Sequence, residues 1–301
     1  MQQNRLNEKT RNRIIGYCFV LPALLYMIAF IGYPIIYNIL ISFQNVTAMT
    51  LSQSGRDFIG LTNYKSIASD PTFPKALLQT FYYTIGCLVF QFSIGFFLAL
   101  FFCKNFSFAK QTRGFIVISW MLPVTVTALI FKFMLAEGNG VINLLLLQLN
   151  IIDKPIGWLI YKETAMWGVI IANSWIGIPF NMLLLTSGLN NIPQEVYEAS
   201  SIDGANSFQR FTKITLPLLK PTMMSVLVLG FVYTFKVFDL VYVMTAGGPV
   251  DATEVMSTYS YRLSFKFYQF GQGAAVANVL FICLFFVALL YLKTITKEEV
   301  I

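Results

Sequence analysis

Long apolar runs dominate this chain and constrain its fold more than any other feature. Six of them are long enough to cross a hydrocarbon core of about 30 Å, which requires roughly 20 helical residues. Backbone groups inside lipid must find hydrogen-bond partners within the protein, so only helices and closed barrels can span it. Segments of about ten residues with alternating polarity, from which membrane barrels are built, are absent. The sequence therefore predicts an all-α integral membrane protein.

The six predicted transmembrane helices cover residues 14–43, 79–103, 115–135, 164–189, 222–245 and 271–292. Another apolar run, 141–152, is too short to cross and is predicted to be interfacial or re-entrant. The chain then divides into an N-terminal tail (1–13), one membrane domain (14–292) and a C-terminal tail (293–301). The first run is too long for a cleavable signal peptide and no small-residue cleavage site follows it, so we expect the first helix to remain.

Composition agrees with one membrane domain and no attached soluble domain. Charged residues make up 12% of the chain, whereas an ordinary soluble domain has roughly a quarter. The net charge of +7 requires no nucleic acid as a partner, since basic residues beside membrane helices set topology and meet anionic lipid.

The distribution of Lys and Arg predicts the orientation. If the N-terminus is cytoplasmic, the inner segments carry Arg5, Lys9, Arg11, Arg13, Lys104, Lys110, Arg113, Arg210, Lys213, Lys220, Lys293 and Lys297. The outer segments are longer in total and carry only Arg56, Lys65, Lys75, Lys154, Lys162, Arg262 and Lys266. Because basic residues accumulate on the cytoplasmic side, both termini and the loop 190–221 are predicted to be cytoplasmic.

Several chemistries lack the residues they need. The chain has no His, and its four cysteines, Cys18, Cys87, Cys103 and Cys283, show no metal-ligand spacing, so we predict no metal site and assign them to packing. No Gly is followed by Lys, which excludes a P-loop. If the protein uses ATP, another subunit must bind it.

The polar loop between the fourth and fifth spans is predicted to form a helix-turn-helix. Pro193 can open a helix that continues over 194–201, because its missing N–H would be unpaired in the first turn. Glu195 and Glu198 lie on one face of that helix. Gly204 can adopt a backbone angle that most residues avoid, so we expect it to turn the chain into a second helix over 207–214.

Pro217 and Pro221 are predicted to mark the end of that second helix and the start of the fifth span. The simplest interpretation of such a loop is an amphipathic connector on the membrane surface. Its spacing favours another one: E-A-S from Glu198, three residues, Gly204, nine residues, then Ile214, Leu216 and Pro217. This pattern closely resembles the E-A-A loop of the membrane subunits of bacterial ABC importers, especially the carbohydrate branch, with Ser200 where the family has Ala.

Three further stretches resemble the larger membrane subunits of maltose-type importers and the glycerol-phosphate importer subunits. G-L-x-N-Y is matched at 60–64, N-x-W-x-G-x-P-aromatic at 173–180, and T-x-G-G-P at 245–249. The resemblance covers most of the chain and implies a type I ABC importer permease fold with its coupling loop between helices 4 and 5.

The resemblance also implies partners. Such subunits pair with a second homologous permease subunit, receive a carbohydrate from an extracytoplasmic solute-binding protein, and rest on two ATP-binding subunits, an identical or shared pair, which hold the ATP and Mg. They sit in the bacterial cytoplasmic membrane and are not enzymes. The coupling residues implied are Glu195, Glu198, Ala199, Ser200, Asp203, Gly204, Ile214, Leu216 and Pro217.

Substrate contacts in maltose-type subunits come from the fourth and fifth spans. The matched motifs transfer them onto Ile176, Gly177, Phe180, Gly230, Tyr233, Thr234 and Val237. Aromatic faces suit the C–H surface of a sugar, and hydroxyls suit its OH groups. Ordinary helix packing is the competing interpretation of Phe180 and Tyr233.

Lys236 and Asp239 complete the predicted substrate path, because ionisable groups inside membranes are costly and typically functional. They lie three apart, on one predicted helical face. Three interpretations are open: the two pair with each other, they reach water near the outer end of the span, or Lys236 meets an anionic cargo such as a sugar phosphate or glycerol phosphate.

Other polar residues in the spans allow two roles. Lys132 is predicted to extend to the outer surface, and Gln91, Asn173, Asn181 and Asn278 either line the path or join helices. An ion-coupled secondary transporter would need coupling groups in mid-span and offers no reason for the E-A-S loop. An intramembrane enzyme would need a nucleophile with a base, or paired acids.

Overall fold

The computed structural model describes residues 2–52, 55–104 and 108–298. Met1, residues 53–54, 105–107 and 299–301 lie outside it, so the ends of both predicted tails are not described. The chain divides into two compact units, residues 1–67 with 262–278, and residues 68–261 with 279–301. Regular secondary structure within the described residues consists of helices and one isolated β-bridge between Gln44 and Phe58.

The first unit is built from the N-terminal helix and a small bundle at its end. Its helical elements are α1 (Gln2–Met27), η1 (Ile28–Gly32), α2 (Tyr33–Ser42), most of α3 (Thr62–Ser69), η3 (Arg262–Lys266) and the start of α14 (Phe270–Glu298). The Asn278 amide accepts a hydrogen bond from Asn38 (2.7 Å) and donates one to the Tyr64 hydroxyl (3.2 Å). Asn278 therefore joins helices and takes no part in the cavity described below.

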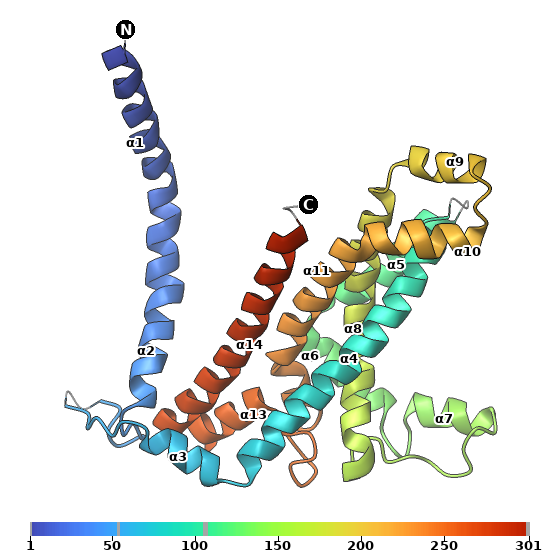
Figure 1. The fold of residues 1–301 in the computed structure, drawn as a ribbon. Helices are drawn as coiled ribbons and strands as arrows, with labels where there is room; N and C mark the ends of the chain where they lie inside the picture. Colours follow the sequence, from blue (N-terminus) through green and yellow to red (C-terminus); the bar gives the residue numbers. More distant parts are fainter. Residues whose placement is uncertain (1, 53–54, 105–107, 299–301) are drawn as a thin grey trace. The chain divides into compact units, whose positions relative to one another are not determined.

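The second unit contains the remaining elements. These are α4 (Thr72–Phe102), α5 (Ala109–Met121), α6 (Val124–Met134), α7 (Val141–Gln148), α8 (Lys162–Asn190), α9 (Gln194–Ile202), α10 (Ser207–Arg210), η2 (Phe211–Thr215), α11 (Leu216–Phe235), α12 (Asp239–Met244) and α13 (Met256–Tyr261). Figure 1 shows α9 and α10 beyond one end of α8, and α7 beside its opposite end.

Five helical stretches within the described residues are long and apolar enough to cross a membrane. They are Arg13–Ser42, Thr72–Phe102, Lys162–Asn190, Ser207–Phe235 and Phe270–Lys293. The run predicted to be interfacial forms α7, whose eight residues span about 12 Å, too little to cross.

The third predicted span, 115–135, is not one helix. It consists of α5 and α6, which pass the same test only as a pair bent by 98°. Pro123 lacks an N–H and disfavours the helical conformation of the residue before it, and Leu122 has the extended angles φ −70° and ψ 140°. The prediction missed this break because Pro123 lies within a continuous apolar run, and the whole run was counted as one span.

Close packing of α4 on α8 forms the centre of the second unit (Figure 1). A Cβ atom added to Gly95 of α4 would lie 2.7 Å from Asn181 Cβ, and one added to Gly86 would lie 2.9 Å from Ile170 Cδ1. Small residues let helix backbones approach in this way, which is how membrane helices gain van der Waals contact. The buried cluster around this contact includes Tyr83, Cys87, Phe131, Val169 and Leu240.

Candidate functional site

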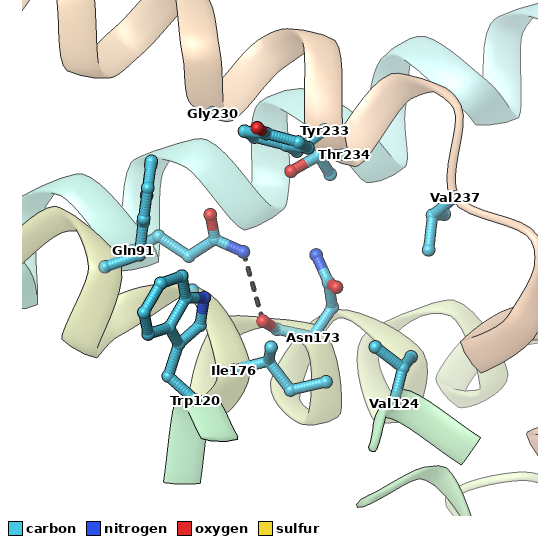
Figure 2. A pocket seen from close by; sticks show the side chains of 11 residues that line it. Gln91, Trp120, Val124, Asn173, Ile176, Gly230, Tyr233, Thr234 and Val237 are labelled. Carbon is cyan, nitrogen blue, oxygen red and sulfur yellow. Dashed lines mark hydrogen bonds between the residues drawn. The ribbon is translucent and has the colours of Figure 1, made fainter. Parts of the chain in front are cut away.

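A cavity of ≈ 340 Å³ opens beside the α4–α8 contact. It is lined by Gln91 of α4, Trp120 of α5, Val124 of α6, Asn173, Ile176, Gly177 and Phe180 of α8, Gly230, Tyr233 and Thr234 of α11, and Val237. Figure 2 shows the α8 and α11 side chains facing each other across it. Seven residues that the sequence motifs place on a substrate path therefore share one cavity.

Aromatic rings form one wall of the cavity. The Phe180 ring lies 5.8 Å from the Trp120 ring and 5.9 Å from the Tyr233 ring, which it meets nearly edge to face at 84°. Such rings offer flat apolar faces, and the Tyr and Trp edges keep a polar atom available. Trp120 was not predicted from the sequence because the motifs that carry the substrate path lie in other helices.

Amides and a hydroxyl supply the polar part of the lining. Gln91 Nε2 donates to the main-chain carbonyl oxygen of Asn173 at 3.1 Å, so this glutamine both joins α4 to α8 and faces the cavity. Asn173 is 8% exposed and its amide extends into the space between α8 and α11 (Figure 2). Asn181 instead donates to the Gly177 carbonyl of its own helix at 2.8 Å and does not line the cavity.

The prediction that Lys236 and Asp239 share a helical face is wrong. The helix α11 ends at Phe235 and α12 begins at Asp239, and the two side chains form no ion pair with each other. The Ser257 hydroxyl hydrogen-bonds to the Val237 carbonyl and so satisfies a group that the break leaves without a helical partner. Both charged residues are exposed, and the fifth span accordingly ends at Phe235 rather than at 245.

Two lysines have defined partners near this break. Lys236 Nζ lies 5.4 Å from the centroid of the Tyr233 ring, a cation–π contact at the edge of the aromatic wall. Lys132 Nζ donates to the Val243 carbonyl at 3.1 Å, so it caps the last turn of α12.

At the far end of α8, the loop predicted for coupling forms the expected pair of helices. The helix α9 ends in a Schellman motif: the Gly204 N–H donates to Ser201 O (3.2 Å) and the Ala205 N–H to Ser200 O (2.9 Å). Gly204 has φ +75°, the left-handed conformation that favours glycine. Asn206 then starts α10 with a capping box to Gln209.

The predicted coupling residues fall on two elements. Glu195, Glu198, Ala199, Asp203 and Gly204 are exposed along α9 and its end, whereas Ser200 is buried at 8% exposure. Ile214, Leu216 and Pro217 lie on the second helix, where Pro217 alone of the three is exposed. The loop therefore presents its acidic side chains outward.

The predicted break at Pro217 and Pro221 is wrong, since the helix runs without interruption from Ser207 to Phe235. The π-helical turn η2 precedes Pro217, and there the Leu216 N–H reaches back to the Phe211 carbonyl. A wider turn shifts the hydrogen-bond register before the proline, where an ordinary turn would place its ring against a carbonyl. The loop and the cavity are thus connected by one helix.

The other matched motifs have structural roles. Asn63 in the G-L-x-N-Y stretch is buried and donates to the carbonyls of Ser42 and Gln44, both at 2.9 Å. Gly247 in T-x-G-G-P has φ +90°, and a Cβ atom there would lie 2.5 Å from the buried Glu254 carboxylate. These residues shape loops within their own units.

Comparisons with known proteins agree with the motifs. The family of binding-protein-dependent transport system inner membrane components matches residues 91–297. The trehalose/maltose transport system permease protein MalF of Thermococcus litoralis is 32% identical over 96% of this chain and 97% of its own length. A probable ABC transporter permease protein of Brucella suis is 30% identical over 96% of this chain and 99% of its own.

Solved structures show the same fold. A bacterial ABC transporter involved in the import of the acidic polysaccharide alginate contains a chain that matches with a TM-score of 0.77, at 22% identity, over 96% of this chain and 99% of that one. This likeness shows the fold, and the family match, which covers the cavity and the α9–α10 loop, assigns the chain. It belongs to the family of binding-protein-dependent transport system inner membrane components, the membrane permease components of ABC transporters, which are not enzymes.

Proposed function

We propose that this chain is the permease subunit through which an ATP-driven, binding-protein-dependent importer moves a sugar or oligosaccharide. The observation that carries the proposal is the cavity: aromatic rings on one wall and amide and hydroxyl groups beside them. Its volume, ≈ 340 Å³, lies within the range of about 300–1,000 Å³ typical of small-molecule sites. Rings that cover C–H faces and groups that pair with hydroxyls are what a carbohydrate requires.

The relatives support the cargo class. The Thermococcus litoralis protein is named for trehalose and maltose transport, and it matches nearly the whole of this chain. In the assembly we propose, the chain pairs with a second permease subunit, receives its cargo from an extracytoplasmic binding protein, and rests on two ATP-binding subunits that hold ATP and Mg. Both termini and the α9–α10 loop face the cytoplasm in this arrangement.

The α9–α10 loop is the proposed contact with the ATP-binding subunits. Its outward acidic edge, Glu195 and Glu198, suits a basic cleft on a partner. Ile202 and Phe208, which flank the turn, are 87% and 74% exposed and would lose that exposed apolar surface on docking.

Movement of this loop reaches the cavity through one element. The helix Ser207–Phe235 is continuous, and its last two turns carry Gly230, Tyr233 and Thr234 of the cavity lining. A rigid helix transmits a shift of its first turn over roughly 40 Å, the length of about 29 residues. ATP-driven closure of the partner subunits would in this way change which side of the membrane the cavity faces, which is alternating access.

The proposal is tested by purification and reconstitution. The chain is expressed with its neighbouring transport subunits, and we expect it to copurify with a second permease and an ATP-binding protein. Liposomes holding the complete complex should accumulate sugar only when ATP and the binding protein are both present. Uptake by the chain alone, driven by an ion gradient, would contradict the proposal and favour a secondary transporter.

A further inference from the structure

Gln91 is held in one orientation at the centre of the cavity lining. Its Nε2 group donates to the Asn173 carbonyl oxygen at 3.1 Å, and its side chain is 3% exposed. The opposite orientation of the amide would place two acceptor oxygens against each other, so the hydrogen bond fixes which atom points where. Figure 2 shows the Gln91 oxygen turned away from α8, toward the wall formed by α11.

Gly177 provides the space for this amide. A Cβ atom at Gly177 would lie 2.2 Å from Gln91 Cδ, 2.4 Å from Oε1 and 2.5 Å from Nε2. The terminal group of Gln91 therefore occupies the space that the side chain of any residue other than glycine would need at position 177. Asn173 and Gly177, one turn apart on α8, together hold the amide in place.

Thr234 faces the same space with an uncommitted hydroxyl. Three buried threonines of α4 and α8, Thr80, Thr84 and Thr186, donate to the carbonyl four residues before them at 2.7 Å. Within the part of the chain that the structure describes, Thr234 has no such bond, although it is only 5% exposed. Its hydroxyl remains available to a ligand in the cavity, on the wall that Gln91 Oε1 faces.

No charged side chain is among the eleven that line the cavity. Lys236, the nearest cation that the sequence offered for an anionic cargo, lies outside the lining and stacks on the Tyr233 ring. A phosphate group among the eleven lining side chains would exchange its hydration for neutral partners, which is costly. A hydroxyl, in contrast, can donate to Gln91 Oε1 and exchange a hydrogen bond with Thr234 at little loss.

We propose that Gln91, positioned by Asn173 and Gly177, is a specificity-determining residue that accepts a hydrogen bond from a cargo hydroxyl, and that the cavity selects neutral sugars over their phosphate esters. The inference rests on the proposed function and names the substrate class of the same cavity. Gln91 contacts the cargo directly, and Gly177 acts through it.

The test uses the complete importer in liposomes with its own binding protein. Uptake of trehalose, maltose, glucose 6-phosphate and glycerol 3-phosphate is measured at saturating binding protein, together with ATP hydrolysis. We expect at least one neutral sugar to enter and both phosphate esters to be excluded. In Gln91→Leu, uptake of that sugar per ATP hydrolysed should fall about five- to tenfold, as expected for one lost hydrogen bond.

Matched variants separate this role from folding. Gln79 lies on the same helix and donates to the Ala252 carbonyl at 2.9 Å, away from the cavity. Gln79→Leu should keep the sugar-to-ATP ratio of the unmodified importer. Gly177→Ala should lower the ratio as Gln91→Leu does, and adding Gly177→Ala to Gln91→Ala should cause little further loss, because the displaced side chain is already absent.

The outcomes are distinguishable. An unchanged ratio in Gln91→Leu, or entry of a phosphate ester as fast as a neutral sugar, overturns the inference while the proposed function stands. Failure of the unmodified importer to carry any of the sugars overturns both. A misassembled Gln91→Leu complex would lower uptake and ATP hydrolysis together, so Gln91→Met, which keeps the side-chain length without the amide, provides a second measurement and should lower the ratio to a similar extent.

Discussion

The hydroxyls of Tyr197 and Thr215 lie 3.0 Å apart and share a hydrogen bond that joins α9 to the π-helical turn at the base of α11. A second bond, from Arg210 to the Ser201 hydroxyl at 3.0 Å, joins α9 to α10, the first turn of the same continuous helix. The proposed docking helix is thus tied directly to the helix that reaches the cavity. Its movement therefore has a path besides the backbone of the turn at Gly204.

Removing the first of these bonds should loosen coupling. In Tyr197→Phe the ring remains but the bond to Thr215 is lost, at a cost of about 1 kcal/mol. We expect less sugar transported per ATP hydrolysed, with complex assembly unchanged. Thr212→Val is the control, because the Thr212 hydroxyl bonds only within its own helix. Equal ratios in both variants would argue against transmission through this contact.

Reversing the charge at Glu198 should uncouple the importer more strongly. Glu198 is exposed on α9, so Glu198→Lys should insert normally but repel a basic cleft on the ATP-binding subunit. Copurification of that subunit and sugar uptake should both fall at least tenfold. Gln194→Ala removes only the 3.0 Å hydrogen bond that Gln194 donates to Glu198 and should have a small effect. Normal uptake in Glu198→Lys would refute the coupling assignment.

Gly204 should tolerate few replacements. At φ +75° an alanine is destabilised by about 1–2 kcal/mol, whereas asparagine adopts this conformation more readily. Gly204→Ala should therefore lower the midpoint of thermal unfolding of the protein and the amount of sugar transported per ATP hydrolysed. Gly204→Asn should lower both by less. Gly138 also has open space around it but no positive φ. If Gly138→Ala behaves like Gly204→Ala, backbone strain is not the cause.

The α4–α8 contact should be sensitive to a single methyl group. Gly95→Ala would place its Cβ 2.7 Å from Asn181 Cβ and 3.1 Å from the Met182 nitrogen, which should destabilise the fold by about 1–3 kcal/mol. Gly114→Ala on α5 meets nothing within 4 Å and should be neutral or stabilising by up to about 1 kcal/mol. Thermal unfolding in detergent distinguishes them, and equal midpoints would contradict the close packing.

Removing the central ring of the aromatic wall should reduce transport without reducing stability greatly. Phe180 touches both Trp120 and Tyr233, so Phe180→Leu removes a ring face that a sugar would cover, with an expected loss of about 1 kcal/mol or several-fold in uptake. Phe286→Leu on α14, at a ring that is 61% exposed, is the matched control. A similar loss in both variants would show that general packing is responsible.

The helical fold and the α9–α10 turn could be predicted from the sequence because both depend on neighbouring residues. The length of the apolar runs determines that they are helices, since lipid offers no hydrogen bonds to the backbone. Gly204 and Asn206 determine the turn, because only a few residue types adopt a left-handed angle or cap a helix. The family motifs likewise identified seven cavity residues, all from α8, α11 and the residues just after α11.

Tertiary structure decided what depends on distant segments. Pro217 does not end a helix because the π-helical turn before it shifts the hydrogen-bond register, while Pro123 does break one. The gap between Lys236 and Asp239 is supported by Ser257 of α13, and the Gln91 amide rests on Gly177 of another helix. Local pattern cannot foresee such partners, because the hydrogen bonds and close contacts that fix these side chains form only when residues far apart in the chain pack together.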